Sequence, residues 1–210
     1  MKGKVELLAI TPDCKRVIEQ AGRTCYRSGS KSQPGSEKEF IPRVIKNGHH
    51  SVLEHGYATF RITGVSRSFT HQLVRHRLCA FSQRSQRYVN EENFAYVEPQ
   101  SIAENAEAHR IFEKIMNDTK YAYRELQNLG IKNEDARYVL ANGTQSEIVI
   151  SANFRQLRHM FCVRCDRHAQ LEIRTIVLQM LRIMKKEAPS VFGDFVIDEE
   201  TSTAYTPFYS

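Results

Sequence analysis

The sequence predicts a mixed α/β protein (α+β) of one domain, and three observations support this prediction. Short runs of apolar and β-branched residues alternate with longer stretches whose apolar residues recur at helical spacing. One helical region, near residues 101–128, is much longer than the others. With 210 residues, 41% of them hydrophobic and 26% charged, the chain fits one globular domain over residues 1–210.

The first half of the chain alternates between strand and helix signals. Residues 5–10 form a short apolar run closed by Thr11-Pro12-Asp13, which predicts a strand followed by a helix start. The pattern then predicts a helix over 14–26, a polar loop over 28–36, a helix over 37–46, a strand over 57–63, a turn at 64–66 and a helix from Ser66 to about Arg77. Residues 80–89 carry polar groups on both faces, which is typical of a strand or loop that lines a polar cavity.

The second half is mainly helical. Apolar residues near 3.6 spacing predict the long helical region, with Gly130 as its stop. Shorter elements follow: a helix over 133–140, a β-branched strand over 147–151, a helix from 153 to about 164 and an amphipathic helix over 172–187 that Pro189 ends. We expect the tail to residue 210 to be partly ordered.

Composition excludes several classes of protein. The net charge of +6 suits an anionic ligand or a nucleic acid and does not choose between them. No apolar run is long enough to span a bilayer and no apolar leader follows Met1, so we expect a cytoplasmic protein without a membrane partner. The five cysteines are odd in number and scattered, which favours reduced thiols over a disulfide framework.

Residues 75–88 are the most informative stretch of the chain. They contain four arginines, one histidine, two serines and two glutamines. No Asp or Glu occurs between Arg61 and Asn90, and no Lys occurs between Asn47 and Glu113. A plain solvated face would mix both signs of charge, whereas the planar fork of Arg holds phosphate or carbonyl oxygens in a fixed geometry. We interpret this stretch as the anion-holding wall of a nucleotide site.

A second arginine segment follows the strand predicted over 147–151. Arg155, Arg158 and Arg164 stand among apolar residues, and no Lys occurs between Lys132 and Lys185. Each arginine segment lies beside a predicted junction between a strand and a helix. The two segments therefore suggest two walls of one site, or two subunits that face each other.

Metal and thiol chemistry are weaker interpretations. His49, His50 and His55 lie close together, but they do not share a helical face, so a loop bordering a site is favoured over a metal site. Cys162 and Cys165 form a single pair, whereas a zinc ribbon needs two, so core cysteines are favoured. We expect no bound metal.

Three residues of the arginine-rich stretch are candidate reactive groups. Ser85 lacks the surrounding motif of a serine nucleophile, which favours a hydroxyl that binds phosphate or ribose. Cys79 can be a nucleophile toward a pyrimidine or a small buried thiol, and the second is favoured. His76 can be a general base, a stacking residue or a structural helix residue, and its arginine neighbours would keep it neutral.

Several motifs resemble one known family. Arg75-His76-Arg77, then seven residues, then Ser85 is similar to the signature of the flavin-dependent thymidylate synthases. The resemblance covers roughly residues 5 to 190, and its further landmarks are Gly48-His49, Glu54-His55, Gln72, Ser85-Gln86-Arg87-Tyr88, Arg137, Asn153-Phe154-Arg155, Arg164, Asp166 and His168-Ala169-Gln170.

The resemblance implies a fold and an activity. The fold is the thymidylate synthase-complementing fold, in which a mostly antiparallel central sheet is flanked by helices, with one long helical region. The activity makes dTMP from dUMP with carbon from 5,10-methylenetetrahydrofolate and hydride from NADPH, passed through FAD. No protein nucleophile is required, and the flavin supplies a redox step that no side chain of this chain can perform. The enzyme would be a homotetramer whose sites are shared between subunits.

The resemblance also implies roles for matching residues. Arg164 would be catalytic, lying at the pyrimidine and favouring its ionised form. The residues that would hold dUMP are Gln72, Arg75, Gln83, Arg84, Ser85, Gln86, Arg87, Arg137 and Arg164. The residues that would contact FAD are Ser51, Arg75, His76, Arg77, Gln83, Asn153, Arg155 and His159.

One alternative from another class is an arginine-rich nucleic-acid-binding module, with Phe81 or Tyr88 stacking on bases. It predicts a broad exposed stripe of mixed Lys and Arg and a steep salt dependence. The missing lysines and the apolar neighbours argue against it, so we expect no nucleic-acid partner.

Overall fold

A computed structural model describes residues 3–208, and the chain divides into two compact units that are described separately. Unit 1 contains Ile62–Arg75 and Ser82–Ile148 together with the first residues of the chain. Unit 2 contains Val5–Arg61, His76–Phe81 and the chain from Val149 onward. Each unit is therefore assembled from segments that are far apart in the sequence.

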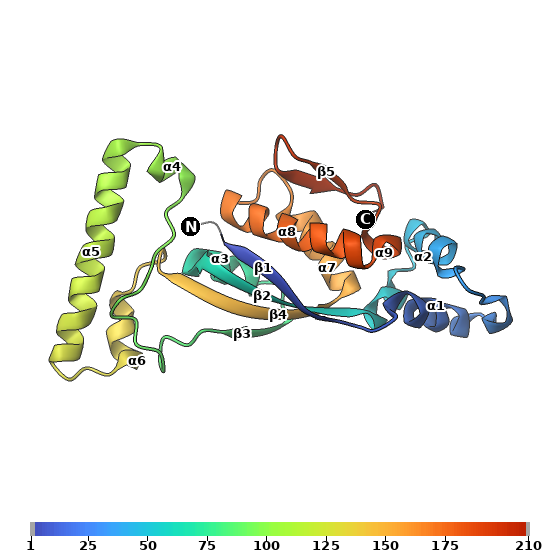
Figure 1. Cartoon of the computed structure of the whole chain (residues 1–210), viewed down its shortest axis with the longest axis horizontal. Coiled ribbons are helices and arrows are strands. Elements are labelled where there is room, and N and C mark those ends of the chain that lie inside the picture. Colours follow the sequence, from blue (N-terminus) through green and yellow to red (C-terminus); the bar gives the residue numbers. More distant parts are fainter. Residues whose placement is uncertain (1–2, 209–210) are drawn as a thin grey trace. The chain divides into compact units, whose positions relative to one another are not determined.

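The predicted central sheet is present and has four strands in the order β1-β2-β4-β3. Its strands are β1 (Lys4–Ile10), β2 (Tyr57–Ser66), β3 (Ala80–Gln83) and β4 (Gln145–Asn153) (Figure 1). The end of β1 meets the start of β2, where Thr11 N donates to the Tyr57 carbonyl at 2.9 Å. The start of β2 meets the end of β4, because the hydroxyl oxygens of Thr59 and Ser151 are 2.8 Å apart. These pairings are antiparallel, as the resemblance implied.

Burial along β4 alternates strictly, so that one face of the strand belongs to the core. The turn predicted at 64–66 is wrong, because β2 continues to Ser66. Gly64 has φ of +70° there, a backbone conformation that only glycine adopts easily.

Unit 2 carries most of the helices and the aromatic core. Its helices are α1 (Cys14–Cys25), α2 (Glu37–Lys46), α7 (Phe154–Arg164), α8 (Leu171–Glu187) and α9 (Pro189–Phe192). The Phe192 ring packs edge-on against Phe154 and Phe161, with ring centroids 5.4 and 5.7 Å apart. α7 packs against α8, and α2 packs against α1 and α9. Two short 3-10 helices, η1 (Gly29–Lys31) and η2 (His50–His55), belong to the same unit.

The C-terminal segment forms a short antiparallel hairpin of β5 (Val196–Asp198) and β6 (Thr203–Tyr205). This order agrees with the partly ordered tail that we expected, although residues 209 and 210 lie outside the described residues. Pro189 ends α8 as predicted and also begins α9.

Unit 1 contains the long helical region, which is broken near its start. Asn105 separates α4 (Gln100–Ala103) from α5 (Ala106–Asn128), and its side chain accepts hydrogen bonds from the backbone N–H groups of Glu107 and Ala108. This N-cap makes the break stable. α5 buries Met116, Thr119 and Tyr123, whereas the apolar stripe includes Ile111, which is exposed.

The other helices of unit 1 are shorter than predicted. Ser66 caps α3 (Arg67–Leu73) by accepting a hydrogen bond from Phe69 N, so the predicted start is confirmed. The helix ends at Leu73 and not near Arg77, because residues 74 and 75 form a turn. The helix predicted over 133–140 is α6 (Asn133–Ala136) followed by the 3-10 helix η3 (Arg137–Val139). Within residues 3–208, no helix is both long and apolar enough to cross a membrane.

Candidate active site

Unit 1 gathers the residues that were expected to hold a nucleotide, apart from Arg164. Gln72 lies on α3, and Arg75 lies in the turn beyond its end, although the helix predicted to about Arg77 would have contained both residues. Gln83 ends β3, and its side-chain amide donates to Thr70 Oγ1 at 2.9 Å and to Ser146 Oγ at 3.3 Å. These bonds tie Gln83 to the sheet and to α3, so its position is fixed.

The segment that follows β3 carries hydroxyl and guanidinium donors. Arg87 N donates to Ser85 Oγ at 3.2 Å, and the Arg87 guanidinium lies 5.2 Å from the Tyr88 ring centroid. Gln86 is buried, and its side-chain nitrogen has no hydrogen-bond partner among the described residues. Backbone, hydroxyl and guanidinium donors within four residues can hold an anion from several sides.

One acidic residue brings two of the predicted arginines together. Arg87 Nε donates to Glu134 Oε2 at 2.6 Å, and Arg137 Nε donates to the Glu134 carbonyl at 3.0 Å. The Arg87 hydrogen bond lowers the pKa of Glu134, so this carboxylate is charged at neutral pH. Arg87 and Arg137 are thus neighbours, although 50 residues of chain separate them. The sequence carried no signal of this pairing.

Unit 2 gathers Arg164 and most of the residues that were expected to contact a flavin. Asn153 caps α7, because its side-chain oxygen accepts a hydrogen bond from Gln156 N at 2.8 Å. Two residues further along the chain, in the first turn of α7, Arg155 Nη1 donates to Glu54 Oε1 at 2.6 Å. Asn153, Arg155 and His159 line one pocket of about 670 Å³, together with His50 and Tyr57.

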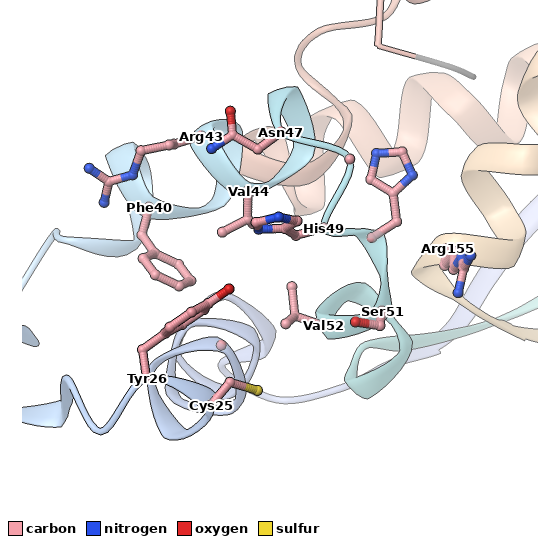
Figure 2. A pocket seen from close by; sticks show the side chains of 13 residues that line it. Cys25, Tyr26, Phe40, Arg43, Val44, Asn47, His49, Ser51, Val52 and Arg155 are labelled. Atoms are coloured by element: carbon pink, nitrogen blue, oxygen red, sulfur yellow. The ribbon is translucent and has the colours of Figure 1, made fainter.

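A second pocket of about 540 Å³ shares His50 and Arg155 with the first. Figure 2 shows Ser51 and Arg155 at one side of it and the rings of Tyr26 and Phe40 at the other. Tyr26 and Phe40 were not singled out in the sequence. Tyr26 directly follows α1, and an exposed aromatic residue at a helix end is a weak signal that points to this pocket only in retrospect.

A buried histidine accepts a hydrogen bond from the predicted catalytic arginine. His76 is only 6% exposed, and Arg164 Nε donates to its Nε2 at 3.0 Å. Its ring also meets the His159 ring edge-on, with centroids 5.9 Å apart. Burial, followed by the charges of Arg164 and His159, lowers the pKa of His76 to about 4. The ring is therefore neutral as predicted, but burial and Arg164 cause this, rather than the flanking arginines that were expected to do so.

Thiol chemistry at three cysteines is disfavoured. Burial raises the pKa of Cys79 to about 11 and the pKa of Cys162 and Cys165 to about 12. Such thiols stay protonated at neutral pH, so Cys79 is a weak nucleophile. All five cysteines are free thiols. Residues 3–208 contain no group of three His, Cys, Asp or Glu side chains that could bind a metal ion.

Comparisons with a family model, with related sequences and with a solved structure all match one family of proteins. Residues 6–190 match the family model described as thymidylate synthase complementing protein. A flavin-dependent thymidylate synthase from Geobacter sulfurreducens is 40% identical over 199 residues, covering 91% of this chain and 86% of that protein. Another from Nitratidesulfovibrio vulgaris is 41% identical over 209 residues, covering 90% of this chain and 85% of that protein.

A solved structure shows the same fold. It is thymidylate synthase X from Helicobacter pylori, crystallised with FAD and dUMP. The two chains superpose with a TM-score of 0.73 at 28% sequence identity, over 91% of this chain and 98% of that one.

Proposed function

This chain belongs to the family of flavin-dependent thymidylate synthases, and we propose that it converts dUMP to dTMP at a site built from both of its arginine segments. The observation that carries the proposal is the bond between Arg164 and a neutral His76 among residues that match flavin contacts. A charged guanidinium with a fixed direction is what a reaction that builds negative charge on uracil oxygens needs.

FAD is proposed to lie in the two adjoining pockets of unit 2. The residues present fit such a group, because arginine and amide donors suit its pyrophosphate and the exposed aromatic rings suit its ring systems. Ser51, Asn153, Arg155 and His159 would hold it. When bound, FAD supplies the redox step.

The nucleotide is proposed to bind the donors of unit 1. Ser85, Arg87 and Arg137 would hold the phosphate, because Arg87 contacts both Ser85 and Glu134, and Arg137 donates to the Glu134 carbonyl. Arg164 would stabilise the charge that develops on the uracil oxygens. No protein nucleophile is needed in this scheme, which agrees with the high pKa of Cys79.

Several further features are part of the proposal. We propose 5,10-methylenetetrahydrofolate as the carbon donor, NADPH as the reductant, and a cytoplasmic homotetramer whose sites are shared between subunits. One synthase domain would span residues 1–210. These features rest on family membership.

The alternative of a nucleic-acid-binding module finds no support. Among the arginines of the two segments, Arg84, Arg87, Arg155 and Arg158 pair with Glu91, Glu134, Glu54 and Asp194, respectively. The Arg158 side chain is only 5% exposed, so it cannot belong to a stripe of arginines open to a phosphate backbone.

The decisive experiment is tritium release from [5-³H]dUMP with FAD, NADPH and methylenetetrahydrofolate, each omitted in turn. Release that needs all three, from a protein that is yellow or becomes so with FAD, is the expected result. A colourless protein that ignores FAD and retains RNA would contradict the proposal.

A further inference from the structure

A buried acid lies immediately beyond the acid-free arginine stretch. Glu91 is the first acidic residue after Asn90, and it is only 3% exposed. Its backbone N–H donates to the Tyr123 hydroxyl of α5 at 3.3 Å. The pKa of Glu91 is raised, because burial outweighs the opposite effect of the charges of Arg84 and Arg67. A buried carboxylate is costly unless cations compensate it, so its position is defined by those arginines.

The ion pair between Arg84 and Glu91 closes the nucleotide-binding segment into a loop. Arg84 Nε lies 3.3 Å from Glu91 Oε1, and Arg84 Nη2 lies 3.4 Å from Glu91 Oε2. The residues between the two members include Ser85, Gln86 and Arg87. The two ends of the loop are thus held together by side chains.

Arg84 also anchors this loop to the sheet. Its backbone N–H donates to the Glu147 carbonyl at 3.0 Å, and its guanidinium donates to the Gln145 carbonyl. The guanidinium therefore points into the protein, toward β4 and Glu91. We expected Arg84 to hold dUMP, but its charged group is already committed to these internal partners.

We propose that Glu91 is a positioning residue for the nucleotide, which acts by fixing Arg84 and so holding Ser85 and Arg87 in their binding geometry. This inference rests on the proposed function, because it takes dUMP as the ligand of the loop. Preorganisation of this kind strengthens binding, because the loop then loses less conformational freedom when the ligand arrives. A pocket of about 450 Å³ opens beside the pair.

The test compares two Glu→Gln variants of the full-length, FAD-loaded protein. Glu91→Gln removes the charge and keeps the shape. The matched control is Glu19→Gln, because Glu19 is 2% exposed and also pairs with an arginine, Arg23, at 2.7 Å. Glu19 lies on α1, in the unit that does not contain the loop. The dUMP and FAD dissociation constants are measured by titration calorimetry, and kcat and KM by tritium release.

A positioning role predicts a specific pattern of effects. Glu91→Gln should raise the dUMP Kd and KM about tenfold, which is typical for the loss of a charged hydrogen bond. Its FAD Kd should be unchanged, and its kcat should fall by less than about threefold, since the loop holds the substrate and does not touch the reacting atoms. Glu19→Gln should leave the dUMP Kd unchanged. Unaltered dUMP affinity in Glu91→Gln, or an equal loss in both variants, would overturn the proposal.

Two more variants cover the remaining outcomes. If Glu91→Gln fails to fold, Glu91→Asp takes its place, because it retains the negative charge but moves it one methylene further from Arg84. The dUMP Kd of Glu91→Asp should then lie above the wild-type value and below a tenfold increase. A wild-type dUMP Kd would overturn the inference. The double variant Arg84→Gln with Glu91→Gln should bind dUMP only slightly more weakly than Arg84→Gln alone, because the two residues act as one pair. If the two substitutions reduced dUMP affinity additively, Glu91 would not act through Arg84. A wild-type chain that shows no dUMP binding would instead refute the proposed function.

Discussion

Arg164 Nε donates a hydrogen bond to His76 Nε2 across 3.0 Å, although 88 residues of chain separate them. The acceptor nitrogen carries no proton, and this agrees with the pKa of His76, which is lowered to about 4. In the neutral ring the proton then lies on Nδ1. His76 therefore orients the Arg164 guanidinium, to which we assign the catalytic role. Because the His76 ring is neutral, it does not offset the positive charge of Arg164.

Arg164→Ala should reduce turnover about 10²–10³-fold, because it removes a preorganised positive charge from the developing oxyanion. Tritium release from [5-³H]dUMP measures the loss, and circular dichroism checks the fold. The control is Arg182→Ala, which removes an exposed arginine paired with Glu199 in the same unit. Near-normal turnover in Arg164→Ala would remove this residue from the catalytic role.

The lowered pKa of His76 makes stability depend on pH. An unfolded histidine takes up its proton near pH 6.5, whereas the folded one does so near pH 4. The unfolded state therefore binds more protons between these values, so this contribution to stability is complete above about pH 6.5 and is lost as the pH falls toward 4. The loss amounts to about 3 kcal/mol in total.

Urea unfolding at pH 7 and at pH 4.5 measures this loss in the wild type and in His76→Gln, which keeps an acceptor and cannot be protonated. The variant should lose less stability on acidification. His109→Gln should not lose less stability than the wild type, because the bond to Glu98 raises the pKa of His109 and this residue therefore favours the folded state as the pH falls from 7. Equal acid sensitivity in His76→Gln and the wild type would show that His76 is not the group responsible.

Gly22→Ala tests the second pocket of unit 2. A Cβ at this position would lie 2.7 Å from Cζ of Phe40, so the ring has to move. Overpacking of this kind costs about 1–3 kcal/mol of stability, and the displaced ring should weaken FAD binding because Phe40 lines the pocket. Flavin fluorescence titration measures the affinity. Gly29→Ala, where an added Cβ meets nothing within 4 Å, is the control, and equal FAD affinity in all three proteins would place the flavin elsewhere.

The ion pair between Arg158 and Asp194 should be important for stability. The two terminal nitrogens of the Arg158 guanidinium, Nη1 and Nη2, donate to the Asp194 carboxylate at 2.7 Å, and the side chains are only 5% and 16% exposed. Asp194→Asn leaves a buried positive charge without its counterion and should cost about 3–5 kcal/mol in urea unfolding.

The surface pair of Arg182 and Glu199 provides the comparison for that measurement. Its side chains are 43% and 69% exposed, so Glu199→Gln should cost less than about 1 kcal/mol. If Asp194→Asn and Glu199→Gln lowered the free energy of unfolding by similar amounts, burial would not decide how much each ion pair contributes to stability.

Local patterns predicted most elements well. The helix at Glu37–Lys46 has the predicted bounds, because its apolar spacing and the stop near Gly48 are both local signals. The break at Asn105 was missed, although an asparagine followed by a helical pattern is itself an N-cap signal. The 66–77 helix was predicted too long, because the buried His76 is bonded to Arg164 and does not continue the helix.

The sequence proposed residues for the candidate site, but it carried no signal of how their side chains pair. The absence of acids near residues 75–88 marked the arginine stretch, but the carboxylates of Glu91 and Glu134 reach it through tertiary contacts. The role of Glu134 depends on a contact 47 residues away in the chain, which no local period encodes. Tyr26 and Phe40 come to one pocket for the same reason.

The cysteines of the chain differ widely in accessibility. Cys25 is exposed at the end of α1 and lines the pocket that contains Ser51, whereas burial keeps Cys79, Cys162 and Cys165 protonated at neutral pH. A maleimide dye should therefore attach first at Cys25, without any engineered cysteine. Quenching of that dye would then report directly on when the cofactor enters or leaves the protein.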